Sequence, residues 1–354
     1  MSKYDDVFES PGTKQPVILS VYNQKGGVGK TTTSVNLAVS LAALGKNVVL
    51  IDFDPQSSAS GNFLLEKEAK IGIHDLLNQE VFIEDAVTPT TFDGLSMVSG
   101  ARKLYSLEHA LDRQGGSQRK LRRALHFTEN APDYIVIDCP PALGHLAAGA
   151  LAASDRLIVP VFPGGYALDG LKRTLTVVEH IQNGMNPHLK LAGILMLSLT
   201  NDQVGRESLA KVGEEYADLM FRTAVPYDAD VVKATYRRMP ASIFNPEGRT
   251  TARFLALAWE IIHGRGKALP DAEQNQGLQR IQQWHEATSA SYASAHQAGS
   301  VTQQAAPAAE AKKAGKSRVD AFVVALVMGL VAGFALGVTA GERILDTVWV
   351  RSAP

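Results

Sequence analysis

Residues 25–32 read Lys25-Gly26-Gly27-Val28-Gly29-Lys30-Thr31-Thr32 and come directly after an apolar run at 17–22. Glycine tolerates the backbone angles of a tight turn and lets several backbone N–H groups approach phosphate oxygens. A helix is expected to follow at 30–44, so the order is strand, glycine-rich turn, helix. This pattern predicts a phosphate-binding loop rather than a simple helix-capping turn with two solvated lysines.

The loop carries two lysines for which we expect different roles. Lys30 is placed to reach the β- and γ-phosphates, and the Thr31 hydroxyl beside it is an oxygen ligand suited to Mg²⁺. Lys25 lies on the entry side of the loop, too far from its own phosphates to duplicate Lys30. We therefore expect Lys25 to cross a two-fold axis into the nucleotide of a second copy, so that ATP joins a homodimer.

Three further segments, together with the loop, resemble the ParA/MinD family of deviant P-loop ATPases, whose signature is KGGxGKT[ST]. The resemblance extends over about residues 15–265 and points to the short ParA group also called Soj. The segments are Asn47 to Gln56 (NVVLIDFDPQ), similar to the second-strand motif that ends in DxDPQ; Tyr134 to Pro141 (YIVIDCPP), similar to the Walker B strand; and Tyr166 to Leu171 (YALDGL), similar to YALEGL.

The resemblance implies ATP and Mg²⁺ as cofactors and gives roles to the aspartates that end the strands. Buried parallel strands deliver carboxylates to the edge of the sheet where ligands bind, so Asp52 and Asp138 are expected near the metal, through water. Asp54 is expected to reach the water that attacks the γ-phosphate. The full expected site comprises Lys25, Lys30 and Asp54 as catalytic residues; Gly26, Gly27, Val28, Gly29, Lys30, Thr31, Thr32 and Pro226 as nucleotide-binding residues; and Thr31, Asp52 and Asp138 as metal-binding residues.

Length and composition fit such an enzyme. The chain has 354 residues, 45% of them hydrophobic and 20% charged, enough for one large core and additional segments. A net charge of −1 gives no overall attraction to nucleic acid, so any DNA contact needs a local basic patch. The single cysteine, Cys139, excludes an intrachain disulfide and argues against the cluster-carrying iron proteins of the superfamily, which need cysteine pairs.

Alternating apolar runs and helical patterns predict an α/β P-loop NTPase with a mostly parallel sheet and helices on both faces. Strands are expected at 17–22, 47–52, 95–98, 134–138, 156–161, 190–197 and 221–225. Helices are expected at 30–44, 72–79, 101–112, 117–127, 166–183, 205–219 and 250–264. The expected domains are a flexible arm at 1–15, the ATPase domain at 16–266, a linker at 267–318, a transmembrane helix at 319–343 and a short tail at 344–354.

A basic group follows the last predicted strand. Its members Lys233, Arg237, Arg238 and Arg249 would bind DNA phosphates without reading bases if they share one face of the dimer. An ordinary solvated basic face is the alternative interpretation.

The C-terminal part has a different composition. Residues 268–318 are rich in Ala, Gln and Ser and predict a flexible tether with an amphipathic helix around Leu278, Ile281 and Trp284. Residues 321–340 carry no charge over a length that crosses a bilayer, and lysines precede them. We expect a single-pass segment in the cytoplasmic membrane with the ATPase domain in the cytosol; a buried soluble helix or a surface-bound helix is the alternative.

Three functions stay open from the sequence. The first is a slow ParA-type ATPase, stimulated by a ParB-like or other activating protein, that positions or partitions DNA or a protein complex from the membrane. The second is a MinD-like regulatory scaffold without a DNA role. The third is a bacterial tyrosine kinase, which usually carries a C-terminal tyrosine cluster, whereas the last tyrosine here is Tyr292.

Overall fold

The computed structural model describes residues 15–63, 71–78, 81–100, 104, 117–127 and 130–304. The expected arm before Gln15, the transmembrane segment at 319–343 and, except for Leu104, the helix at 101–112 lie outside these residues. Contacts divide the chain into Met1–Ala298 and Gly299–Pro354, and the description below concerns the first unit. Among the described residues, no helix is both long enough and apolar enough to cross a membrane.

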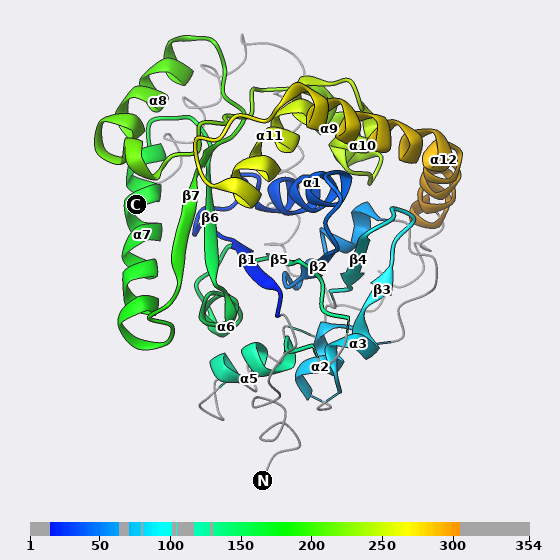
Figure 1. Cartoon of the computed structure of the whole chain (residues 1–354), viewed down its shortest axis with the longest axis horizontal. Helices are drawn as coiled ribbons and strands as arrows, with labels where there is room; N and C mark the ends of the chain where they lie inside the picture. The colour runs from blue at the N-terminus through cyan, green and yellow to red at the C-terminus, as the bar shows by residue number, and fades with distance from the viewer. Residues whose placement is uncertain are drawn as a thin grey trace, which may run out of the picture. The chain divides into compact units, whose positions relative to one another are not determined.

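A seven-stranded sheet forms the centre of the unit, in the order β3-β4-β2-β5-β1-β6-β7 (Figure 1). All neighbouring strands are parallel except β3, which runs antiparallel to β4. The strands are β1 (Val17–Val21), β2 (Val48–Asp52), β3 (Thr88–Pro89), β4 (Leu95–Val98), β5 (Tyr134–Asp138), β6 (Arg156–Val161) and β7 (Lys190–Met196). The expected mostly parallel sheet is confirmed.

Helices cover both faces of this sheet (Figure 1). They are α1 (Lys30–Ala43), α2 (Ile73–Asn78), α3 (Ile83–Ala86), α5 (Ser117–Ala124), α6 (His145–Ala153), α7 (Ala167–Gly184), α8 (Gln203–Tyr216), α9 (Ala229–Tyr236), α10 (Ala241–Phe244), α11 (Arg249–His263) and α12 (Asp271–Gln304), with the short 3₁₀ turns η1 (Ser60–Asn62) and η2 (Ala217–Leu219).

The strands supply two hydrophobic cores because successive side chains point to opposite faces. In β5, Ile135 and Ile137 enter the core that includes α6 and α7, whereas Val136 enters the core that includes α1, α11 and α12. Strands buried on both faces read as continuous apolar runs, which is why the sequence predicted them well.

Residues 221–225, expected to be a strand, do not form one, although the amides of Phe221 and Val225 donate to the carbonyls of Ile194 and Met196 in β7. The N–H groups of Arg222 and Thr223 instead donate to the carboxylate of the buried Glu260 on α11, at 3.1 and 2.8 Å. Backbone donors that bind a side chain cannot continue a ladder, so the strand does not form.

Helix α6 was not predicted. Its sequence, HLAAGALAA, consists mainly of small apolar residues and has no polar stripe, so the helical period is hidden. Its buried residues pack into the core beside β1 and α5.

Helix α12 lies where we expected a flexible linker. The amphipathic helix expected around Leu278, Ile281 and Trp284 is present, but it runs from Asp271 to Gln304. Ile281 and Trp284 are buried, and the Trp284 ring lies 5.4 Å from that of Phe92. The Arg280 guanidinium donates to the carbonyls of Ala42 and Ala43 at the end of α1. Residues 271–292 are therefore part of the compact unit, because their apolar face is buried on the sheet side.

Candidate nucleotide site

The carboxyl ends of three adjacent strands bring the expected site residues together. Asp52 at the end of β2 is the register partner of Asp138 at the end of β5, and Asp138 is in turn the partner of Val21 at the end of β1. The glycine-rich loop follows β1 directly. The sheet therefore places the loop and both aspartates at one edge, as predicted for an open parallel sheet.

The loop has a backbone that only glycine adopts easily. Gly27 and Gly29 have φ of 73° and 82°, in the left-handed region. Gly29 is also the residue before α1, and as a glycine it has no side chain to accept from the first N–H groups of that helix. Those N–H groups, with the positive end of the helix dipole, suit an anion such as phosphate.

Lys30 is held in place by the loop that precedes it. Its Nζ donates to the carbonyls of Asn23 and Lys25, at 3.1 and 3.0 Å. Burial lowers the pKa of the Lys30 ammonium, and the nearby Asp138 carboxylate opposes that shift. An ammonium has three donors, so one remains for a ligand in the pocket.

Asp138 is fully buried and bonded to two hydroxyls of α1. Thr31 Oγ1 donates to its Oδ2 at 2.8 Å, and Ser34 Oγ donates to its Oδ1 at 2.9 Å. Burial, followed by repulsion from Asp52, raises the pKa of Asp138 to about 7. A carboxylate and a hydroxyl in contact beside a phosphate-binding loop form an all-oxygen donor set, which is the chemistry that Mg²⁺ prefers.

Asp52 has a different environment from the one expected. Its Oδ2 accepts from both the amide and the hydroxyl of Ser60, and its Oδ1 accepts from the amide of Asp54 at 3.3 Å. Burial raises its pKa to about 6. The Asp52 carboxylate is thus bonded to the loop that carries Asp54, and these contacts indicate that it holds that loop.

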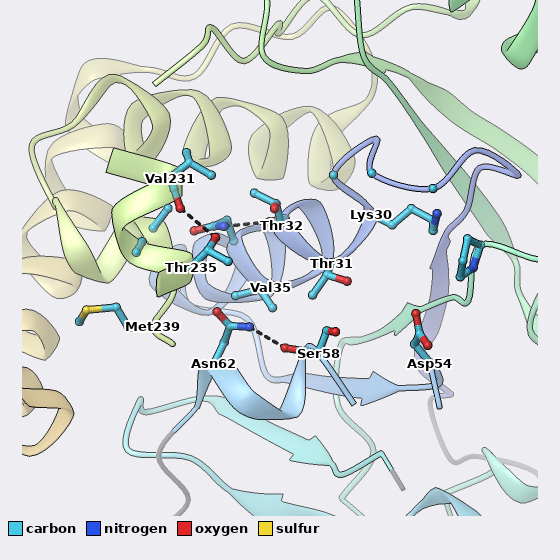
Figure 2. A pocket seen from close by; sticks show the side chains of 17 residues that line it. Lys30, Thr31, Thr32, Val35, Asp54, Ser58, Asn62, Val231, Thr235 and Met239 are labelled. Atoms are coloured by element: carbon cyan, nitrogen blue, oxygen red, sulfur yellow. Dashed lines mark hydrogen bonds between the residues drawn. The ribbon is translucent and has the colours of Figure 1, made fainter. Parts of the chain in front are cut away.

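Thr31, Lys30 and Asp54 lie at the same end of a pocket of about 390 Å³ (Figure 2). Gly26, Gly27, Gly29 and Thr32 also line it, whereas the side chain of Val28 is buried on the other side of the loop. Asp54 Oδ1 accepts from the Gln56 amide at 2.9 Å, which fixes the carboxylate at the pocket edge.

Lys25 is exposed and does not line this pocket. It lines a separate groove of about 610 Å³ with Pro141, Leu143, Tyr166 and Arg173. Its backbone is well fixed, since its amide donates to Asn23 Oδ1 at 3.0 Å and its carbonyl accepts from Lys30. Lys25 therefore lines a groove other than the pocket that contains Lys30 and Thr31.

The other end of the pocket was not predicted. Figure 2 shows Val231, Thr235 and Met239 at this end, with Ser58 and Asn62 between the two ends. The first three come from α9 and the turn after it. The signal that would have revealed this helix is Asp228, whose side chain accepts from the Asp230 amide as an N-cap.

Pro226, expected to contact the nucleotide, lies behind the loop. It lines a smaller cavity of about 140 Å³ with Gly27, Gly29 and Thr32. It is therefore next to the loop but separate from the main pocket.

The expected DNA-binding residues are all exposed. Lys233, Arg237 and Arg238 lie on α9 or directly after it, and Arg249 begins α11. Lys233 forms an ion pair with Asp230 at 2.8 Å, and the Arg237 guanidinium lies 5.5 Å from the centre of the Phe244 ring. Two of the four charges are thus already engaged within the protein.

Comparisons with known proteins agree with this geometry. A family model described as an AAA domain matches residues 16–191. The sporulation initiation inhibitor protein Soj of Bacillus subtilis is 35% identical over 246 residues, which are 69% of this chain and 97% of Soj. The chromosome partitioning protein ParA of Myxococcus xanthus is 32% identical over 247 residues, 69% of this chain and 87% of that protein.

Among solved structures, cobyrinic acid a,c-diamide synthase from Mycobacterium smegmatis with bound ATP analog and magnesium has a TM-score of 0.59 and 27% identity, covering 72% of this chain and 99% of that one. The loop, the strand-end aspartates and the near-complete coverage of Soj lead to one conclusion: this chain belongs to the ParA/Soj-type family of P-loop ATPases.

Proposed function

We propose that this protein is a ParA-type ATPase that uses ATP and Mg²⁺, forms a dimer when ATP is bound, and positions or partitions a cargo. The observation that carries the proposal is that the two lysines of the loop have different environments. Lys30 is buried and bonded into its own loop, whereas Lys25 is exposed on a separate groove. A cation in that position is available to a second copy.

Each side chain at the site has a defined task in ATP hydrolysis. Lys30 Nζ would donate to phosphate oxygens, Thr31 Oγ1 would hold Mg²⁺ directly, and the Asp138 carboxylate, which accepts from that hydroxyl, would hold the ion through water. Asp54 accepts a hydrogen bond from the attacking water and orients it. Mg²⁺, when bound, neutralises charge on the phosphates. One protomer alone leaves the phosphates without Lys25, so we expect slow hydrolysis before dimerisation.

The test is the oligomeric state, measured by light scattering with and without ATP. We expect ATP to convert wild-type monomers to dimers, and Lys25→Ala to stay monomeric while it still binds a fluorescent ATP analogue. Lys211→Ala removes an exposed lysine of α8 and should behave as wild type. An identical mass with and without ATP in the wild-type protein would rule out the ATP-controlled dimer.

DNA is the first cargo to test, because four exposed basic residues follow β7. Arg238→Glu with Arg249→Glu should weaken retention of DNA and reduce the slope of its salt dependence by about two units. Lys211→Glu with Lys190→Glu, elsewhere on the surface, is the matched control. Unchanged DNA retention in the first pair, or absence of DNA binding by the wild type with ATP, would favour the MinD-like scaffold.

Membrane attachment through residues 321–340 rests on their sequence alone. We expect the full chain in the membrane fraction and a chain without residues 319–354 in the supernatant after lysis. Recovery of both in the supernatant would contradict the tether and leave the ATPase proposal intact.

A phosphotyrosine assay with ATP tests the tyrosine-kinase alternative. We expect no phosphotyrosine signal.

A further inference from the structure

Two buried polar residues outside the phosphate cradle connect it to helix α7. Asn23 comes just before the loop, and Thr174 lies two turns beyond the start of α7; both are almost completely buried. The Thr174 hydroxyl lies 3.2 Å from Asn23 Oδ1 and 3.0 Å from the Gly170 carbonyl, and its one hydrogen is shared between these two acceptors. These residues are far apart in sequence, so the bond joins two separate elements.

The Asn23 side chain also fixes the chain around it. Its Nδ2 donates to the Pro160 carbonyl of β6 at 2.8 Å, and its Oδ1 accepts from the Lys25 amide at 3.0 Å. The neighbouring Gln24 amide points to the Thr174 hydroxyl at 3.4 Å. One amide side chain and one hydroxyl therefore hold the backbone of residues 23–25 from two sides.

The same short segment holds Lys30. The carbonyls that accept from Lys30 Nζ belong to Asn23 and Lys25. The positions of both lysines consequently depend on three residues whose backbone is fixed by Asn23 and Thr174. In a buried network, a lost partner leaves other groups unsatisfied, so the loop should respond strongly.

We propose that Asn23 and Thr174 are positioning residues for hydrolysis, which hold the backbone of Lys25 and the ammonium of Lys30 and make α7 part of the catalytic geometry. The proposal rests on the proposed ATPase function. On the surface side of the same turn, Arg173 lines the groove that contains Lys25. A second copy or partner that displaces α7 thus alters the loop without touching the phosphates.

Thr174→Val tests the hydroxyl, because valine keeps the branched shape and lacks the donor. We expect kcat for ATP to fall about tenfold and KM to change by less than about threefold, since a misplaced Lys25 affects the transition state more than binding. Thr174→Ser keeps the hydroxyl and should restore kcat to within about twofold of wild type. Equal losses in the valine and serine variants would overturn the proposal.

Thr176→Val is the matched control. Its hydroxyl donates to the Lys172 carbonyl within the same helix, as Thr174 does to Gly170, but Thr176 is exposed. We expect wild-type kcat. A tenfold fall in Thr176→Val would show that any loss of a hydroxyl from α7 has this effect, and would overturn the proposal.

A second measurement does not need ATP hydrolysis. In the nucleotide-free protein, amide hydrogen exchange of residues 23–26 should accelerate about tenfold in Thr174→Val and stay unchanged in Thr176→Val. If the wild type proves inactive toward ATP, the proposed function fails and this measurement still decides the link between α7 and the loop. If Thr174→Val does not fold, Thr174→Ala replaces it, because alanine is favourable in a helix. Unchanged amide exchange of residues 23–26 in whichever variant folds would disprove the link between α7 and the loop.

Discussion

The two ends of the nucleotide pocket differ in what holds them. At one end, Lys30 and Thr31 begin α1 and Asp54 follows β2 at the carboxyl edge of the sheet, and hydrogen bonds fix all three. At the other end, Val231, Thr235 and Met239 belong to α9 and its following turn, and α9 packs against α10. Hydrogen bonds of defined direction set the first end, whereas packing between helices sets the second.

This difference predicts two kinds of mutant. A change at the strand edge should alter the rate of hydrolysis with little loss of stability. A change in the helices on the α9 and α12 side of the pocket should lower the free energy of unfolding. It should leave the rate of ATP hydrolysis by the folded protein nearly unchanged. The four predictions below test that separation.

Asp54→Ala should have the largest effect. Removal of the carboxylate that orients water should lower kcat about a thousandfold while KM stays within about threefold. Steady-state phosphate release over a range of ATP concentrations gives both quantities. Asp93→Ala, in an exposed turn, should match the wild type. An Asp54→Ala enzyme with a raised KM and an unchanged kcat would assign the residue to binding instead.

Trp284→Ala should cost about 3 kcal/mol in the free energy of unfolding, because it removes a buried ring that packs on Phe92. Urea unfolding measures this loss. Trp259→Ala deletes a partly exposed indole that stacks on His263 and should cost clearly less. A Trp284→Ala protein that is folded but more than tenfold slower in hydrolysis would break the proposed separation.

The pH dependence of stability should reveal Asp138. Its pKa is about 7 in the folded protein against 3.8 for an ordinary aspartate, so the folded state holds more protons between these values. Its contribution therefore decreases as pH rises from about 4 to about 7, with a slope of up to about 1.4 kcal/mol per pH unit, and is constant above that.

The measurement compares wild type with Asp138→Asn, both free of nucleotide and metal, by urea unfolding at each pH. The difference in free energy of unfolding should fall with rising pH over that window. A difference that rises, or that does not vary, would mean that the folded protein keeps Asp138 ionised.

Tyr292→Phe should have the smallest effect. It removes the hydrogen bond from the Tyr292 hydroxyl to the carbonyl of Asn62, a pocket residue, at a cost of about 1 kcal/mol in stability. Tyr166→Phe, at a mostly exposed ring, should leave the melting temperature unchanged. If Tyr292→Phe changes ATP affinity more than about threefold, α12 contributes directly to nucleotide binding.

The part of the site at the carboxyl ends of the strands could be predicted from the sequence, because each of its segments has a local sequence pattern. Glycines mark the left-handed turns of the loop, and apolar runs that end in Asp52 and Asp138 mark buried parallel strands. The hydrogen bonds from Ser60 to the Asp52 carboxylate could not be predicted, because they depend on the path of the chain through residues 53–60. Likewise, the bond between Asn23 and Thr174 joins residues 151 positions apart.

The helices that were missed have weaker sequence patterns. Helix α9 at the pocket has only eight residues. On the other face of the sheet, α6 is made of small apolar residues without a polar stripe. The Ala, Gln and Ser content of α12 resembles that of a linker, and its buried face depends on a few large residues such as Ile281, Trp284 and Tyr292. Tertiary packing, rather than local preference, determines these elements.

Arg280 has a consequence for how the protein can be divided. Helix α1 starts at the phosphate loop and has no basic residue in its last turn. The amides that follow it bind the carbonyls of Ser40 to Ala42, and the last carbonyl, that of Ala43, accepts from a guanidinium that comes 237 positions later. A fragment that stops at residue 266 would lose this cap and uncover the apolar surface beneath Ile281 and Trp284. The shortest fragment in which the ATPase domain stays soluble and intact must therefore extend past Tyr292.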